Sequence, residues 1–255
     1  MSTPLGRFVW YDHMTPDTES AASFYTQVVG WGTEAWNGPV PYTMFTSNGA
    51  TLGGTMSMPA EASGAPPHWI GYVSTPDIAS TLLEVKRLGG TVHRDATDIP
   101  GVGTFAIVAD PQGAVFALFT PSGDTPGTAG PRRPGDMSWH ELVTTDRDGA
   151  WNFYQALFGW EKGDAFDMGP MGTYQLFSID GQSLGGMMNK TPDMPMPPSW
   201  LYYAMVDDIN AAADRVRDAG GQVVNGPMEV PGGDWILQGV DPNGGMFALH
   251  QRPST

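Results

Sequence analysis

The chain has 255 residues, a formal net charge of −15 and no cysteine. The negative charge argues against nucleic acids and anionic membrane surfaces as partners, because both would repel it. The lack of cysteine excludes disulfide bonds, thiolate metal sites and a cysteine nucleophile. A hydrophobic content of 40% with nine Trp, eight Tyr and 11 Phe indicates a globular protein with a sizeable core.

The N-terminal stretch MSTPLGRF lacks the apolar segment of a secretion signal, and no apolar run of 18 residues occurs. We therefore expect a cytoplasmic protein. For its oligomeric state we expect a monomer or a homodimer, which composition does not distinguish.

The first predicted elements are a strand at residues 8–14 and a helix that begins at Thr15-Pro16-Asp17, with Thr15 as the cap. Gly30 ends this helix. Its apolar residues recur at helical spacing, namely Ala21, Phe24, Tyr25 and Val28. Strands at 42–47 and 50–58 follow and turn at Asn48-Gly49, a dipeptide typical of β-hairpins.

The same scheme recurs in the next 50 or so residues. A strand is predicted at 68–74, a helix from Thr75-Pro76-Asp77 to Gly89-Gly90, and strands near 91–93, 103–109 and 114–120. A turn at 110–113 joins the last two strands. Each of these two blocks is therefore expected to form a strand, a helix and three strands.

The second half of the chain repeats the first. The opening stretch recurs 129 residues later, pairing Trp10 with Trp139, Asp12 with Glu141, Phe24-Tyr25 with Phe153-Tyr154 and Gly30-Trp31 with Gly159-Trp160. Later matches are 131 residues apart, among them Trp69 with Trp200, Tyr72 with Tyr203 and Asp110-Pro111 with Asp241-Pro242. A repeat of this length predicts duplicated domains at residues 1–120 and 138–255, joined by a Pro- and Gly-rich linker at 121–137.

These elements resemble the vicinal oxygen chelate superfamily, also called the glyoxalase/bleomycin-resistance/dioxygenase superfamily. The resemblance covers nearly the whole chain and rests on the strand, the D-x-x-x-A-x-x-F-Y-x-x-x-x-G-W stretch, the Gly-Gly helix end and the Asp-Pro-x-Gly turn. The two-domain layout is similar to that of the actinobacterial 27 kDa antigen-like proteins. The resemblance implies an α+β fold of four βαβββ modules that form two half-barrel cups.

Metal-dependent members of that superfamily hold the metal at three kinds of position. The resemblance places these positions on Trp10, Ile70 and Ala117 in the first half and on Trp139, Leu201 and Ala248 in the second. None of these side chains binds a divalent metal, so we expect no metal cofactor at the usual position. A divalent metal held by Asp12 with His68, or by Glu141 with His250, stays open.

Strand alternation from these positions predicts the other residues that face each cup, if the two modules of each half pair with each other. The first cup would be lined by Trp10, Asp12, His68, Tyr72, Val115 and Phe119, and the second by Trp139, Glu141, Leu201, Tyr203, Met246 and His250. Ala117 and Ala248 would leave room for a ligand. Such a mostly apolar cup with a few polar groups is typical of small-molecule sites, and its aromatic and carboxylate groups suit a planar or cationic ligand.

Each of these residues also has a structural interpretation. The tryptophans can fill the core at a barrel end, the tyrosines can bond the backbone, and the carboxylates can have a structural partner. His68 can lie at a rim and His250 at an exposed strand end. Alternation places Trp69, Trp200, His13 and His140 on the helix side of the sheets, where we expect packing.

Three functions follow from these alternatives. The leading hypothesis is a binding protein for a small organic molecule that works without the usual metal of the family. The second is a lyase or isomerase that acts on a small carbonyl compound with a noncanonical metal or an acid/base pair. The third is an interaction scaffold whose cups are filled by side chains. Whether the chain is an enzyme stays open.

Overall fold

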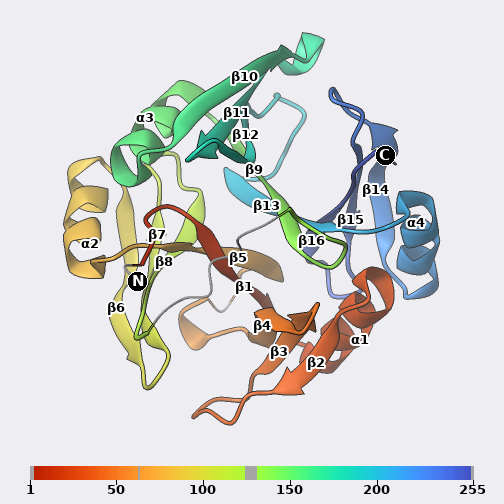
Figure 1. The fold of residues 1–255 in the computed structure, drawn as a ribbon, viewed down its shortest axis with the longest axis horizontal. Helices are drawn as coiled ribbons and strands as arrows, with labels where there is room; N and C mark the ends of the chain where they lie inside the picture. Colours follow the sequence, from red (N-terminus) through yellow and green to blue (C-terminus); the bar gives the residue numbers. More distant parts are fainter. Residues whose placement is uncertain (1–2, 63, 124–130, 254–255) are drawn as a thin grey trace. The chain divides into compact units, whose positions relative to one another are not determined.

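The computed structural model describes residues 3–62, 64–123 and 131–253, in which each half of the sequence forms an eight-stranded sheet with two helices (Figure 1). The first half contains β1 (Phe8–Thr15), α1 (Thr18–Val29), β2 (Gly32–Ala35), β3 (Thr43–Ser47), β4 (Ala50–Ser57), β5 (His68–Ser74), α2 (Ile78–Arg87), β6 (Thr91–Ile99), β7 (Gly103–Ala109) and β8 (Val115–Pro121). The second half contains β9 (Met137–Thr144), α3 (Arg147–Phe158), β10 (Glu161–Asp167), β11 (Thr173–Ile179), β12 (Gln182–Asn189), β13 (Ser199–Met205), α4 (Ile209–Asp218), β14 (Gln222–Glu229), β15 (Trp235–Val240) and β16 (Met246–Gln251).

The two sheets have the same topology. The strand order is β2-β3-β4-β1-β5-β8-β7-β6 in the first and β10-β11-β12-β9-β13-β16-β15-β14 in the second. Within each module the first strand pairs in parallel with the last, as in β1–β4 and β5–β8, and the remaining strands pair antiparallel. This arrangement confirms the predicted α+β fold of four βαβββ modules.

The helix starts differ from the prediction by two residues. The N-cap of α1 is Asp17 and not Thr15, and its carboxylate accepts a hydrogen bond from the backbone N–H of Ser20. Thr15 is instead the last residue of β1, and its hydroxyl accepts a hydrogen bond from the Asp17 N–H. The other three helices begin in the same way, at Asp77, Asp146 and Asp208. Aspartate is the N-cap of all four helices because its carboxylate accepts hydrogen bonds from the free N–H groups and lies at the positive end of the helix dipole.

Two strands at the sheet edges were poorly predicted. All four residues of β2 are exposed, so the strand has no apolar alternation, and the sequence predicted no range for it although the expected scheme of three strands after the helix includes it. The strand β6 extends to Ile99, six residues beyond the predicted end, and most of its residues are exposed. Edge strands with charged and exposed side chains carry little hydrophobic pattern.

The chain divides into two compact units that each draw on both halves of the sequence. Of the described residues, those within Met1–Trp10, Gly71–Ala129 and His140–Trp200 form unit 1. Those within Tyr11–Ile70, Gly130–Trp139 and Leu201–Thr255 form unit 2. The helices α2 and α3 pack together in unit 1, and α1 and α4 pack together in unit 2 (Figure 1).

Each unit has an aromatic core built from matching residues. Unit 2 packs Phe24, Tyr25, Trp31, Trp69 and Phe247, and unit 1 packs Phe153, Tyr154, Trp160, Trp200 and Phe116. In unit 2 the Trp31 indole donates a hydrogen bond of 2.7 Å to the Gly135 carbonyl, within the predicted linker 121–137. Residues 124–130 of that linker lie outside the described residues. No helix among the described residues is long and apolar enough to cross a membrane.

Candidate functional site

Ring contacts with the helices show which face of each sheet carries which side chains. In unit 2, His13 and Trp69 both contact Tyr25 of α1. In unit 1, Trp200 contacts Tyr154 of α3. These residues occupy the helix face, as strand alternation predicted for them. We call the opposite face of each sheet the cup face, and it carries Asp12, which precedes His13 in β1.

A carboxylate–tyrosine pair occupies the cup face in unit 2. Asp12 is 5% exposed, and its Oδ1 accepts a hydrogen bond of 2.5 Å from the Tyr42 hydroxyl. In the β1–β4 ladder Asp12 pairs with Gly54. A Cβ atom on Gly54 would lie 2.4 Å from Cε1 of Tyr42, so the absence of a side chain allows the tyrosine ring to lie over β4 beside Asp12.

Unit 1 repeats this arrangement with a glutamate. Oε2 of Glu141, which is 9% exposed, accepts a hydrogen bond of 3.1 Å from the Tyr174 hydroxyl. Glu141 pairs with Gly186 in the β12–β9 ladder, and a Cβ atom on Gly186 would lie 2.1 Å from Cε1 of Tyr174. We call each set of carboxylate, tyrosine and glycine a cup triad.

The sequence prediction missed the tyrosines and glycines of the cup triads. A signal for them was present, because Tyr174 follows Tyr42 by 132 residues and Gly186 follows Gly54 by the same interval (174 − 42 and 186 − 54). This third repeat offset differs from those of the opening strands and of the second modules.

The predicted room beside Ala248 in unit 2 is filled, which corrects that expectation. Ala248 is buried with Leu201 and Tyr203, and Trp139 and Ile236 pack against them. The Tyr203 hydroxyl accepts a hydrogen bond of 2.7 Å from the Gln238 side chain. The larger side chains pack around the alanine at the close density of a protein interior.

A smaller aromatic group lies on the matching part of unit 1. Tyr72 pairs with Ala117, which is completely buried, and contacts the rings of Phe105 and Phe119. The Arg94 guanidinium lies 5.0 Å from the centre of the Phe105 ring. The other two apolar predictions, Val115 and Met246, are exposed, and Trp10 and Trp139 are half-buried.

His250 is buried in unit 2 and not at an exposed strand end. Nδ1 of His250 lies 2.8 Å from the Ser138 hydroxyl, and Nε2 lies 3.0 Å from Oδ2 of Asp234. Burial lowers the pKa of His250 below its usual value, and the Asp234 carboxylate offsets part of this effect. With both ring nitrogens engaged, His250 is not placed to bind a metal. His68 is half-buried, and its Nδ1 lies 2.8 Å from the Pro66 carbonyl oxygen.

The side chains present do not fit the metal of the family. Its six ligand positions carry tryptophan, isoleucine, leucine and alanine, which have no lone pair suited to a divalent cation. Across the described ranges, no three or more histidine, aspartate and glutamate side chains gather as a metal site would require.

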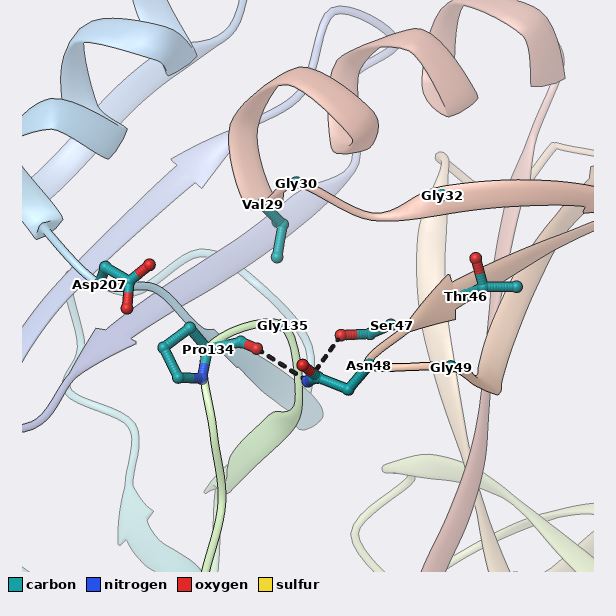
Figure 2. Close-up of a pocket in the computed structure, with 10 residues that line it drawn as sticks. All are labelled: Val29, Gly30, Gly32, Thr46, Ser47, Asn48, Gly49, Pro134, Gly135 and Asp207. Carbon is teal, nitrogen blue, oxygen red and sulfur yellow. Dashed lines mark hydrogen bonds between the residues drawn. The ribbon is translucent and has the colours of Figure 1, made fainter.

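A polar hollow of about 430 Å³ lies elsewhere on unit 2, at the C-terminal end of α1 (Figure 2). The Asn48 amide spans it with hydrogen bonds of 3.0 Å to the Pro134 carbonyl and 3.1 Å to the Ser47 hydroxyl. None of the predicted cup residues lines this hollow, so it does not serve as the candidate site.

Comparison with known families shows that both halves match the same family. Residues 7–118 and 137–249 both match the sequence profile of the Glyoxalase/Bleomycin resistance protein/Dioxygenase superfamily. The profile covers most of the chain.

Relatives of similar length include "Putative glyoxylase CFP32" of Mycobacterium bovis and of Mycobacterium tuberculosis. Each is 32% identical over 247 residues, covering 94% of this chain and 92% of the relative. The anthracycline biosynthesis protein DauV of Streptomyces sp. (strain C5) is 29% identical over 258 residues, covering 96% of this chain and 92% of DauV.

Among solved structures, the Mn(II)-bound glyoxalase of Novosphingobium aromaticivorans superposes with a TM-score of 0.69 at 15% identity, over 98% of this chain and 83% of that one. The 2,3-dioxygenase LapB of Pseudomonas sp. KL28 superposes with a TM-score of 0.67 at 12% identity, over 100% of this chain and 94% of LapB. At such low identity these likenesses concern the fold alone.

Proposed function

This chain belongs to the Glyoxalase/Bleomycin resistance protein/Dioxygenase superfamily, and we propose that its cup faces bind a small organic molecule without the metal of the metal-dependent members. Glyoxalase chemistry in the family depends on a metal that polarises neighbouring oxygens. A chain that keeps the fold and lacks donors at every usual ligand position is better suited to binding than to that chemistry.

The observation that supports the proposal is that residues without metal-binding groups occupy the six ligand positions, while the cup triads are present in both units. Trp10 and Trp139 stand where the first ligand of each half would be, and alanine stands where the glutamate would be. Polar groups on the cup face include the carboxylates of Asp12 and Glu141, each of which accepts a hydrogen bond from a tyrosine. Apolar and aromatic walls with a few placed polar groups favour a small organic ligand.

Planar aromatic compounds are the ligand class that these side chains suit best. Rings stack on tryptophan, tyrosine and phenylalanine with favourable dispersion and electrostatic contacts. The relatives DauV and DnrV are named for anthracycline biosynthesis, and anthracyclines are planar and polycyclic. An anthracycline such as daunorubicin is therefore a suitable probe, with no claim that it is the physiological ligand.

Equilibrium titration tests the proposal. Tryptophan fluorescence of the metal-free protein should change saturably as daunorubicin or another planar aromatic compound is added, with a Kd that does not change when a chelator is present. A panel of planar compounds that leaves the fluorescence unchanged, with no heat of binding by calorimetry, would exclude this function.

A second candidate is catalysis of a lyase or isomerase reaction, which the name of the CFP32 relatives favours. It would use a metal or an acid/base pair at other residues, such as Asp12 or Glu141. Metal analysis of the purified protein separates the two candidates: a stoichiometric divalent metal that is lost in Asp12→Ala or Glu141→Ala would support the enzyme.

The packed group around Tyr203 favours a third candidate for unit 2, an interaction scaffold with a filled cup. In that case the region around Tyr203 would take up no planar compound, and substitutions at Tyr203 would not alter the titration described above.

A further inference from the structure

We propose that Asn48 is a site of deamidation, and that the carboxylate formed there loosens the segment 133–136 from the turn between β3 and β4 in unit 2. The proposal does not depend on what the cup faces bind. Asn48 is followed by Gly49, and both residues are exposed. A following glycine favours deamidation because it has no side chain to shield its backbone nitrogen.

The reaction needs only the chain itself and water. The backbone nitrogen of Gly49 attacks the side-chain carbonyl carbon of Asn48, the bond to the amide nitrogen breaks, and ammonia leaves with the proton that Gly49 loses. Water then opens the cyclic imide to aspartate or isoaspartate, without oxidation or reduction. The turn has room for this chemistry: a Cβ on Gly49 would meet no atom within 4 Å, and Asn48 lines the polar hollow of about 430 Å³ (Figure 2).

The Asn48 amide holds the segment 133–136 against the turn. Its Nδ2 donates hydrogen bonds of 3.0 Å to the Pro134 carbonyl and 3.3 Å to Oδ1 of Asp136. Both acceptors need a donor, and an ionised carboxylate has none. Deamidation would therefore remove both hydrogen bonds and place a negative charge beside the Asp136 carboxylate, where like charges repel.

Unit 1 shows what accompanies a carboxylate at the matching turn. Asp180 follows Asn48 by 132 residues (180 − 48), and their φ angles are 50° and 51°. Arg7 precedes Asp136 by the repeat offset of 129 (136 − 7), and its Nη2 lies 2.9 Å from Oδ2 of Asp180. A carboxylate at this turn thus has a cationic partner in unit 1, whereas in unit 2 it would face Asp136. The neighbour in unit 2 is matched to the amide and not to its deamidated form.

A second Asn-Gly pair in unit 2 provides the control. Asn37 precedes Gly38, is exposed and lies between β2 and β3. No hydrogen bond among the described residues joins Asn37 to the segment 133–136. The same chemistry at Asn37 should therefore leave that segment unchanged.

Ageing of the purified full chain at mildly alkaline pH tests the modification. Chymotryptic peptides separate the two sites, because Tyr42 and Phe45 lie between Asn37 and Asn48. Mass spectrometry should show conversion of amide to acid at Asn48, with aspartate and isoaspartate as the products. An Asn48 amide that persists after Asn37 has been fully converted would overturn the proposal.

Hydrogen exchange of Asn48→Asp tests the consequence. The backbone N–H of Gly135 donates a hydrogen bond of 2.8 Å to the Met205 carbonyl, and its exchange should become about tenfold faster once the hydrogen bonds of the Asn48 amide are lost. Asn37→Asp makes the same chemical change and should leave this rate unchanged. Combining Asn48→Asp with Asp136→Asn reverses donor and acceptor and should restore most of the protection.

The outcomes are decisive without any ligand, so they are independent of the proposed binding function. Unchanged exchange at Gly135 in a folded Asn48→Asp chain, or an equal increase in Asn37→Asp, would overturn the proposal. Circular dichroism establishes that each variant is folded. If Asn48→Asp does not fold, Asn48→Ala removes the same hydrogen bonds without adding charge and should speed the exchange a few-fold; no increase there would equally contradict the role of the amide.

Discussion

Nε2 of His13 lies 3.0 Å from Oδ2 of Asp241, and both side chains are completely buried in unit 2. The Tyr25 hydroxyl donates a hydrogen bond of 2.9 Å to the same carboxylate oxygen and accepts one of 2.9 Å from the Trp69 indole. The contact of His13 has the distance of an ion pair but not the direction of a hydrogen bond, and its Nδ1 has no hydrogen-bond partner among the described residues.

Unit 1 contains the same network without the histidine. Asp110 accepts a hydrogen bond of 3.0 Å from Tyr154, which in turn accepts one of 3.0 Å from Trp200. The residue that matches His13 is Leu142, which is completely buried. The histidine therefore makes the main chemical difference between the two networks.

The two aspartates respond to this difference in opposite directions. Burial raises the pKa of Asp110, and its hydrogen bonds from Ala114 and Tyr154 offset only part of the increase. Burial also raises the pKa of Asp241, but the close contact with His13, together with the hydrogen bonds from the Gly245 backbone and Tyr25, outweighs it and brings the pKa below its usual value of 3.8. A buried carboxylate ionises more easily when more polar groups lie against it to stabilise its charge.

We predict that His13→Leu destabilises the protein by about 3–5 kcal/mol, because it leaves the Asp241 charge buried without its partner. Gly245→Ala alone should lower the free energy of unfolding by about 1–3 kcal/mol. The added Cβ would lie 2.8 Å from Nε2 of His13 and 2.7 Å from Oδ2 of Asp241. Unit 1 has Ala114 at the position that matches Gly245 and Leu142 at the position that matches His13. The double variant should therefore lose less than the sum of the two single losses, by about 1 kcal/mol or more.

Urea unfolding at pH 7 measures this coupling. The pair His13→Leu with Asp218→Asn is the control and should be additive, because Asp218 is exposed on α4. Additive losses for His13→Leu and Gly245→Ala would contradict the idea that the glycine makes room for the histidine.

The second prediction concerns the dependence of stability on pH. The folded-state pKa of Asp241 is lowered, so its stabilising effect is complete above about pH 4 and is lost as the pH falls through the folded value. The folded-state pKa of Asp110 is raised, so its charge reduces stability progressively as the pH rises from about 4 through the folded value.

Asp241→Asn and Asp110→Asn should therefore change the unfolding free energy in opposite ways on acidification. The cost of Asp241→Asn should decrease as the pH falls below about 4, and the cost of Asp110→Asn should increase between pH 7 and about 4. Urea unfolding at several pH values measures both. Parallel slopes for the two variants would show that His13 does not set the difference.

The third prediction concerns His250, whose pKa is lowered by burial and partly restored by Asp234. Removing that carboxylate in Asp234→Asn should lower the pKa of His250 further, because the opposing charge is lost. Nuclear magnetic resonance of the ring protons as a function of pH measures the shift. His93 is exposed and lies in unit 1, whereas Asp234 lies in unit 2, and the ring signals of His93 serve as the internal reference. An upward shift at His250 would contradict the assigned pair.

The fourth prediction distinguishes the two glycines of β4. A Cβ on Gly53 would lie 2.1 Å from the backbone oxygen of Tyr11, so Gly53→Ala should weaken the β1–β4 ladder and strongly reduce the thermal stability. A Cβ on Gly54 meets only the ring of Tyr42, which can move. Gly54→Ala should lower the free energy of unfolding by only about 1–3 kcal/mol, because the Tyr42 ring can shift away from the added methyl group.

Thermal and urea unfolding of both variants provide the measurements. Gly185→Ala and Gly186→Ala in β12 are the matched pair, since their Cβ atoms would meet the His140 backbone oxygen and the Tyr174 ring in the same way. A loss of stability for Gly54→Ala as large as that for Gly53→Ala would contradict the idea that the Tyr42 ring can move.

The sequence alone determined the features that depend on neighbouring residues. Alternation placed Trp69 and Trp200 on the helix face, where each donates a hydrogen bond to a helix tyrosine. The Asn48-Gly49 dipeptide predicted a hairpin turn, and both residues have the positive φ angles that such a turn requires. The internal repeat identified the four modules, because each module contains the same local pattern of helix caps, turns and periodic apolar residues.

Only the tertiary structure decided which distant side chains meet. Tyr42 reaches Asp12 across 30 residues, and Tyr25 reaches Asp241 across 216. The room expected beside Ala248 is filled by Leu201, Tyr203 and their neighbours. Local periodicity fixes the face on which a side chain lies, whereas the partner and the remaining space depend on strand register and on how the modules pack, which no stretch of sequence specifies alone.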